Sequence, residues 1–100
     1  MKISFTFSKT GLMKYISHLD LMRLLTRAMR RADLPLKFTE GFSPHPKLSI
    51  KRALKLGVES ESEEASILLK EDISPEYFIN KLQKELPEGI KLKDAKRDIN

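Results

Sequence analysis

The stretch ISFTF, residues 3–7, decides how this chain begins to fold. Three apolar side chains, Ile3, Phe5 and Phe7, alternate with Ser4 and Thr6. Successive side chains of a β-strand point to opposite faces, so a period of two predicts a half-buried strand. Its apolar face belongs to the core and its polar face to solvent.

An amphipathic helix is predicted next, over residues 17–32. Ser17 fits the N-cap position, and Asp20 fits the third helical position of a capping box. On a helix with 3.6 residues per turn, Leu21, Leu24, Leu25, Ala28 and Ala32 share one face. Arg23, Arg27, Arg30 and Arg31 share the opposite face. The helix therefore has one apolar side and a row of arginines.

The rest of the chain predicts further extended segments and a second helix. The extended segments are 34–38, with Pro35 typical of an edge strand, 47–56, 65–69 and 90–95. Residues 59–64 are acidic and are expected to form a polar connector. Ser74 as N-cap and Pro75 at the first helical position start the second helix, and Pro87 to Gly89 end it.

This order of elements predicts an α+β fold. Two helices stand at equivalent places, each with strands before and after it, which is typical of a ferredoxin-like (split βαβ) sandwich. We expect a mostly antiparallel sheet with two helices packed on one face. At 100 residues the chain is expected to form a single domain, residues 1–100.

Composition excludes several classes of protein. There is no cysteine, so disulfides, zinc ribbons and cysteine-ligated iron–sulfur clusters are excluded. The spacing of His18, Asp20, Glu40 and His45 is not diagnostic of a metal site, and neither a metal nor a cofactor is expected. No segment approaches the roughly 20 apolar residues of a membrane span, and residues 1–7 do not form a signal peptide. We expect no membrane association and a cytoplasmic location.

The net charge of +5 conceals an asymmetry along the chain. Residues 1–58 contain 12 Lys or Arg and three Asp or Glu, whereas residues 59–100 contain 7 and 11. A basic half favours an anionic partner. The alternative is that the two halves neutralise each other within the fold.

The segment EGFSPHPKLS, residues 40–49, places His45 between two prolines. Proline fixes its own φ and restricts the residue before it, so the backbone at His45 has few conformations. A histidine held in this way suits proton transfer, metal ligation or contact with a phosphate. The alternative is a stiff surface loop whose histidine has no further role.

Basic residues near an exposed aromatic favour an RNA-binding surface, because arginine matches phosphate geometry and aromatic rings stack on unpaired bases. The candidate contacts are Lys9, Lys14, Ser17, Arg23, Arg27, Arg30, Arg31, Phe42, His45 and Lys47. In the alternative interpretation, the arginine face is solvated and pairs with Glu59, Glu61, Glu63 and Glu64. His18 lies at the helix N-terminus, which can bind an anion, although plain capping by Ser17 and Asp20 is the favoured interpretation of that end.

Five blocks of sequence resemble one known family. They are SKTG (8–11), SHLDLMR (17–23), RAMRRADLP (27–35), EGFSPHP (40–46) and LGVESE (56–61). Together they resemble the radical-SAM-linked domain of unknown function, DUF2344. The resemblance implies a radical SAM protein as partner, which would supply the iron–sulfur cluster that this chain cannot hold. It also implies that residues 1–100 are either a short member or the N-terminal part of a longer family domain.

Three functions remain open from the sequence. The first is an accessory domain that binds RNA or another polyanion and presents it to a radical SAM partner. The second is an RNA-processing or RNA-modifying enzyme, for which His18, His45 and Asp20 are the catalytic candidates. The third is a docking module whose arginine row binds an acidic surface of the partner. The first depends on the arginine helix and the proline-flanked histidine forming one positively charged pocket.

Overall fold

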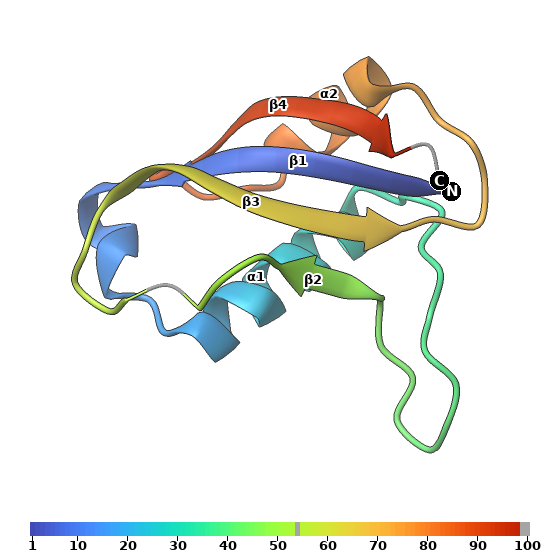
Figure 1. Ribbon diagram of the computed structural model, residues 1–100, viewed down its shortest axis with the longest axis horizontal. Coiled ribbons are helices and arrows are strands. Elements are labelled where there is room, and N and C mark those ends of the chain that lie inside the picture. Colours follow the sequence, from blue (N-terminus) through green and yellow to red (C-terminus); the bar gives the residue numbers. More distant parts are fainter. Residues whose placement is uncertain (54, 99–100) are drawn as a thin grey trace.

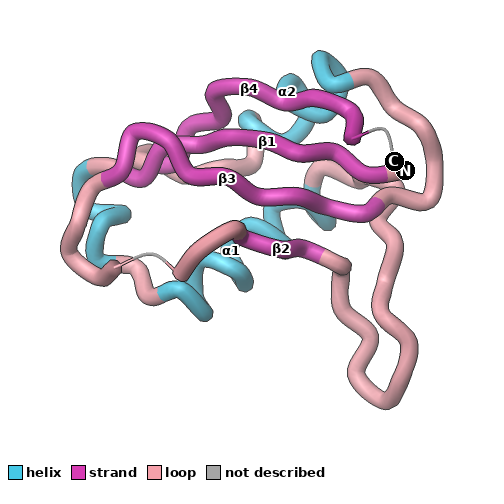
Figure 2. Tube along the Cα trace, in the orientation of Figure 1, coloured by secondary structure: helices cyan, strands magenta, loops and turns pink. Residues whose placement is uncertain are grey.

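The computed structural model describes residues 1–53 and 55–98, so the prediction of extended chain at Leu54 lies outside the described residues. The elements are β1 (Lys2–Lys9), the 3₁₀-helix η1 (Gly11–Tyr15), α1 (His18–Arg31), β2 (Leu48–Ile50), β3 (Ser60–Leu68), α2 (Pro75–Gln83) and β4 (Ile90–Asp98). The strands form an antiparallel sheet in the order β2-β3-β1-β4, which confirms the α+β, ferredoxin-like prediction. Figures 1 and 2 show both α-helices on one side of this sheet.

The core lies between the sheet and the two helices. The inward side chains of the central strand β1 are Ile3, Phe5 and Phe7, and all three are buried. The ring of Phe5 packs against that of Phe78 in α2, with 5.3 Å between centroids. From α1, Leu21 contributes to the same core. The polar side of β1 faces the open surface of the sheet, as the period of two predicts.

Both helices begin where the sequence predicts. The backbone N–H of Asp20 donates to Ser17 Oγ (3.1 Å), and that of Tyr77 donates to Ser74 Oγ (3.0 Å). Each cap satisfies an amide that would otherwise lack a partner in the first turn. No helix in the described part of the chain has both the length and the apolar sequence needed to cross a membrane.

The prediction of an acidic connector at residues 59–64 is wrong, because most of that segment belongs to β3. Thr6 of β1 pairs with Glu64, and Phe7 pairs with Glu63. Basic residues stabilise the acidic half of the strand: Lys51 pairs with Glu64, Arg52 with Glu63 and Lys93 with Glu61. These pairings come from β4 and from the segment after β2, and they outweigh the low strand propensity of glutamate.

The predicted strand over residues 34–38 is also wrong. That segment makes only two isolated bridges, Leu36 to Leu69 and Phe38 to Pro46. The second strand of the sheet is instead β2, within the extended segment predicted for residues 47–56. Residues 36–48 form a projection that we call the proline hairpin, closed by the N–H of Thr39 donating to the carbonyl of His45 (2.8 Å). It extends away from the sheet at the lower right of Figure 1.

Candidate functional site

The outer surface of α1 carries the arginine row. Arg23, Arg27 and Arg31 line one shallow cavity of about 370 Å³, together with Ile16, Asp20 and Leu24. All the arginines of the row are exposed, because the apolar face of α1 is turned to the sheet. The helical spacing of three to four residues places these guanidinium groups next to one another.

Two of the four arginines form ion pairs. Arg23 lies 3.6 Å from the carboxylate of Asp20, and both side chains are more than half exposed. Arg31 donates to both the side chain and the backbone carbonyl of Glu85, at 3.2 and 2.9 Å. Within residues 1–53 and 55–98, no carboxylate lies at ion-pair distance from Arg27 or Arg30.

The alternative pairing of the arginine row with the acidic segment does not occur. Glu61, Glu63 and Glu64 form ion pairs with other basic residues, as described above. The carboxylate of Glu59 accepts a hydrogen bond from the N–H of Gly11 (2.7 Å). Neither Glu59 nor the acidic residues of β3 therefore compensate the charge of the α1 surface, where only Arg23 and Arg31 of the row have a carboxylate partner among the described residues.

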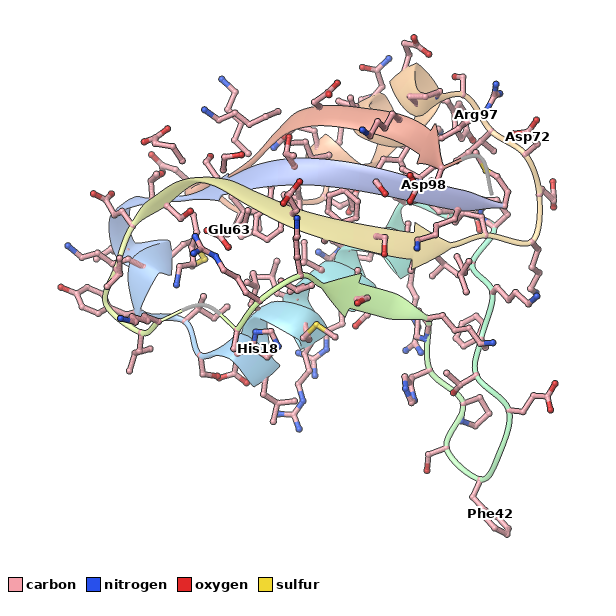
Figure 3. All side chains as sticks on the ribbon, viewed as in Figure 1. His18, Phe42, Glu63, Asp72, Arg97 and Asp98 are labelled. Carbon is pink, nitrogen blue, oxygen red and sulfur yellow. The ribbon has the colours of Figure 1, made fainter. Side chains whose placement is uncertain are left out.

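The proline hairpin meets α1 through one aromatic residue. Arg30 lies over the ring of Phe38, with Cζ 5.4 Å from the centroid, and Phe38 is bridged to Pro46. At the far end of the hairpin, Phe42 is fully exposed, and Figure 3 shows its ring pointing into solvent. An apolar ring in that position is open to solvent over its whole surface.

His45 does not share a pocket with the arginine row, so that part of the prediction is wrong. It lines a separate cavity of about 360 Å³ with Lys2, Thr39 and Lys47, and with residues of β2 and β3. The hairpin contacts α1 through Phe38. After His45 the chain continues through Pro46 into β2, and His45 lines its cavity together with residues of β2 and β3.

The three candidates near the start of α1, Lys14, Ser17 and His18, have different surroundings. The hydroxyl of Ser17 is engaged as the cap of α1, and Lys14 lies over the ring of Tyr15, 5.2 Å from its centroid. Figure 3 shows His18 at the start of α1; its Nδ1 is buried and has no hydrogen-bond partner among the described residues. In that same part of the chain, no three His, Asp or Glu side chains gather closely enough to hold a metal ion.

Lys9 is not available to a nucleic acid, because its side chain is fully buried. Its Nζ donates to the carbonyl of Lys55 (3.1 Å) and lies 3.5 Å from that of Lys14. The amide of Gly57 also donates to the carbonyl of Lys14 (2.6 Å). Lys9 thus joins the end of β1 to the loop before β3. The blocks SKTG and LGVESE meet at the same place, because Lys9 pairs with Ser60 and the N–H of Gly11 donates to Glu59.

An ion pair between the buried Glu63 and the exposed Arg52 lies beside Lys9, and the sequence did not predict it. The Glu63 side chain is 1% exposed and accepts two hydrogen bonds from Arg52, at 3.1 and 2.9 Å, and a third from Ser60. The hydrogen bonds from Arg52 hold the pKa of Glu63 below its usual value, although burial acts in the opposite direction. The only signal in the sequence is the strict alternation that places Glu63, Ala65 and Ile67 on one strand face.

Comparison with known proteins shows the family. No curated protein and no solved structure matches this chain. The sequence does match, over residues 2–98, the family model described as "Uncharacterized protein conserved in bacteria (DUF2344)". Because this match covers nearly the whole sequence, the chain belongs to the DUF2344 family.

Proposed function

We propose that this chain is an accessory domain that binds single-stranded RNA through the α1 surface and the tip of the proline hairpin. The observation that carries the proposal is the exposed pair Arg27 and Arg30, which have no carboxylate at ion-pair distance among the described residues. A guanidinium that is not paired with a carboxylate keeps its hydrogen-bond donors available for a phosphate.

The geometry of the row suits a polyanion. Arg23 and Arg30 are seven residues apart on one helix, which corresponds to about 10 Å along its axis. Several cations at that spacing can contact successive phosphates of one strand, and such contacts position a backbone without reading its sequence. Phe42 adds an exposed ring, which can stack on an unpaired base but not on a base within a duplex.

Presentation of the RNA to a radical SAM protein is the second half of the proposal. It rests on the family resemblance alone. The chain has no cysteine, so it supplies no ligand for a radical-generating cluster, and the reaction belongs to the partner. In this proposal the domain holds the substrate while the partner reacts with it.

The test is binding of a labelled single-stranded RNA at increasing salt concentrations. Arg27→Ala is expected to lower the affinity about five-fold, equivalent to about 1 kcal/mol. It should also reduce the slope of log affinity against log salt by about 0.7 for each phosphate that the variant no longer neutralises. The matched control is Lys91→Ala, which removes an exposed cation from β4, the sheet edge opposite β2.

Two results would reject RNA binding. One is no detectable affinity of the wild type at low salt, and the other is an equal effect of Arg27→Ala and Lys91→Ala. A complex with a radical SAM protein that needs Arg27 but no RNA would assign the arginine row to docking. RNA cleavage or modification by the wild type alone, abolished by His45→Ala, would instead support the enzyme.

A further inference from the structure

The cavity beside His45 differs in charge from the α1 surface. Its lining comprises Lys2, Thr39, His45, Pro46, Lys47, Leu48, Ser49, Ser66 and Leu68, and none of these is acidic. The arginine cavity includes Asp20, and the neighbouring cavity on the open sheet face includes Glu64, Asp94 and Asp98. Two lysines, an imidazole and three hydroxyls without a carboxylate form a lining suited to an anion.

Hydrogen bonds and prolines restrict the backbone that carries the His45 ring. The N–H of His45 donates to Thr39 Oγ1 (3.2 Å), and the N–H of Thr39 donates to the carbonyl of His45 (2.8 Å). Pro44 and Pro46 restrict the same segment. An anion that binds here meets a ring that is already ordered, so the entropic cost of binding is reduced.

The contacts of the His45 ring favour one tautomer. Nδ1 of His45 lies 3.1 Å from the carbonyl oxygen of Ser43, which can only accept, and 3.4 Å from the hydroxyl of Thr39, which can accept or donate. The shorter contact favours a proton on Nδ1. No hydrogen bond within residues 1–53 and 55–98 engages Nε2. Nε2 is therefore the ring atom left for a ligand: when neutral it accepts from a P–OH group, and when protonated it donates to a phosphate oxygen.

The two lysines of the cavity are not equivalent. Lys47 forms no ion pair with a described residue, whereas Lys2 lies 3.8 Å from Asp98. Asp98 also accepts a hydrogen bond from the hydroxyl of Ser4. A bound anion would thus be attracted by the charge of Lys47, whereas it would have to compete with Asp98 for Lys2.

We propose that this cavity is a phosphate site, which takes either free phosphate or the terminal phosphate of a larger molecule. His45 Nε2 and Lys47 are its principal contacts, and Lys2 and the hydroxyls of Ser49 and Ser66 complete it. The cavity shares no residue with the arginine cavity of α1, so the proposal does not depend on RNA binding there.

The experiment is a titration of the ¹⁵N-labelled protein with inorganic phosphate, followed by NMR against chloride at equal ionic strength. Saturable shifts are expected at Thr39, His45 and Lys47, with the His45 ring spectrum showing the Nδ1–H tautomer before phosphate is added. Lys47→Gln should weaken phosphate binding about five-fold. Asp98→Asn should strengthen it, because Lys2 loses its competing partner, and Lys91→Gln should leave it unchanged.

A second arm distinguishes the sources of the phosphate. The same protein is titrated with an oligonucleotide carrying a 5′-phosphate and with the identical strand ending in a 5′-hydroxyl. A preference for the phosphorylated strand, lost in Lys47→Gln, supports a terminal phosphate, and saturable shifts with inorganic phosphate alone support the free anion. The proposal is overturned if neither probe produces saturable shifts around His45, or if Lys47→Gln, folded as its spectrum shows, binds as tightly as the wild type.

Discussion

The guanidinium of Arg30 stacks over the ring of Phe38, with 5.4 Å between Cζ and the ring centroid. This contact joins the arginine helix to the proline hairpin, because Phe38 is in turn bridged to Pro46. The two elements that carry most of the candidate binding residues therefore meet through an aromatic side chain, whereas His45 lines a different cavity from the arginines.

Replacing Phe38 by leucine should loosen the hairpin from α1. The variant keeps an apolar side chain but removes the cation–π interaction, so we expect the free energy of unfolding to fall by about 0.5–1 kcal/mol. Urea denaturation measures this change. Hydrogen exchange at the Thr39 amide, which donates to the carbonyl of His45, should become faster. Phe42→Leu is the control and should change neither quantity, because the Phe42 ring is fully exposed.

Lys9→Met should reduce stability without reducing RNA affinity. Methionine fills a similar volume but donates no hydrogen bond, so the carbonyls of Lys14 and Lys55 lose a partner, at a cost of about 1 kcal/mol. The buried side chain cannot reach RNA. Urea denaturation and RNA binding, measured on the same preparation of folded protein, separate these two effects. A loss of affinity equal to that of Arg27→Ala, in a variant as stable as the wild type, would return Lys9 to the binding surface.

The Arg52–Glu63 pair should make stability depend on pH in the acidic range. The pKa of Glu63 is lowered in the folded protein, so its ionised form stabilises the fold above the unfolded pKa of about 4.3. That contribution is lost as the pH falls through the lowered folded value. Urea midpoints measured from pH 7 to pH 3 should fall less steeply in Glu63→Gln than in the wild type.

At pH 7 the same substitution should cost about 1 kcal/mol, because the buried side chain at position 63 then loses its charge-assisted hydrogen bonds, whereas the exposed Arg52 regains water. Glu64→Gln provides the control at the adjacent residue. Glu64 pairs with Lys51, and both side chains are more than half exposed, so the free energy of unfolding is expected to change by less than about 0.5 kcal/mol. Equal effects of the two substitutions would contradict a special role for the buried Glu63 carboxylate.

Gly89→Ala should be among the most damaging single changes. Gly89 has φ 98°, and a Cβ there would lie 2.6 Å from the carbonyl oxygen of Thr10 and 2.7 Å from Cγ of Met13. Gly11→Ala is the comparison, because Gly11 has φ 61° and a Cβ added there would meet nothing within 4 Å. That variant measures the cost of the left-handed backbone conformation alone, about 1–2 kcal/mol. Thermal or urea unfolding should show Gly89→Ala to be less stable than Gly11→Ala by at least about 1 kcal/mol. Equal stability of the two variants would mean that the contact with η1 can relax.

Local patterns made the main elements predictable. The alternation in residues 3–7 identified β1, and the Ser17 and Ser74 caps identified the starts of both helices, because these signals depend only on neighbouring residues. The same reasoning failed for residues 59–64. Their place in β3 depends on β1 and on basic residues such as Arg52, which lies 11 positions before Glu63 in the sequence.

By itself, therefore, the sequence determined the periodicity of the strands and helices, the absence of cysteine chemistry and the arginine face of α1. Only the tertiary structure decided which of the charged residues remain available. It buried Lys9 against two carbonyls, paired the acidic residues of β3 with other cations, and placed His45 and the arginines in separate cavities. The physical reason is that charge pairing and burial depend on distances between segments far apart in the chain, which periodicity and composition do not contain.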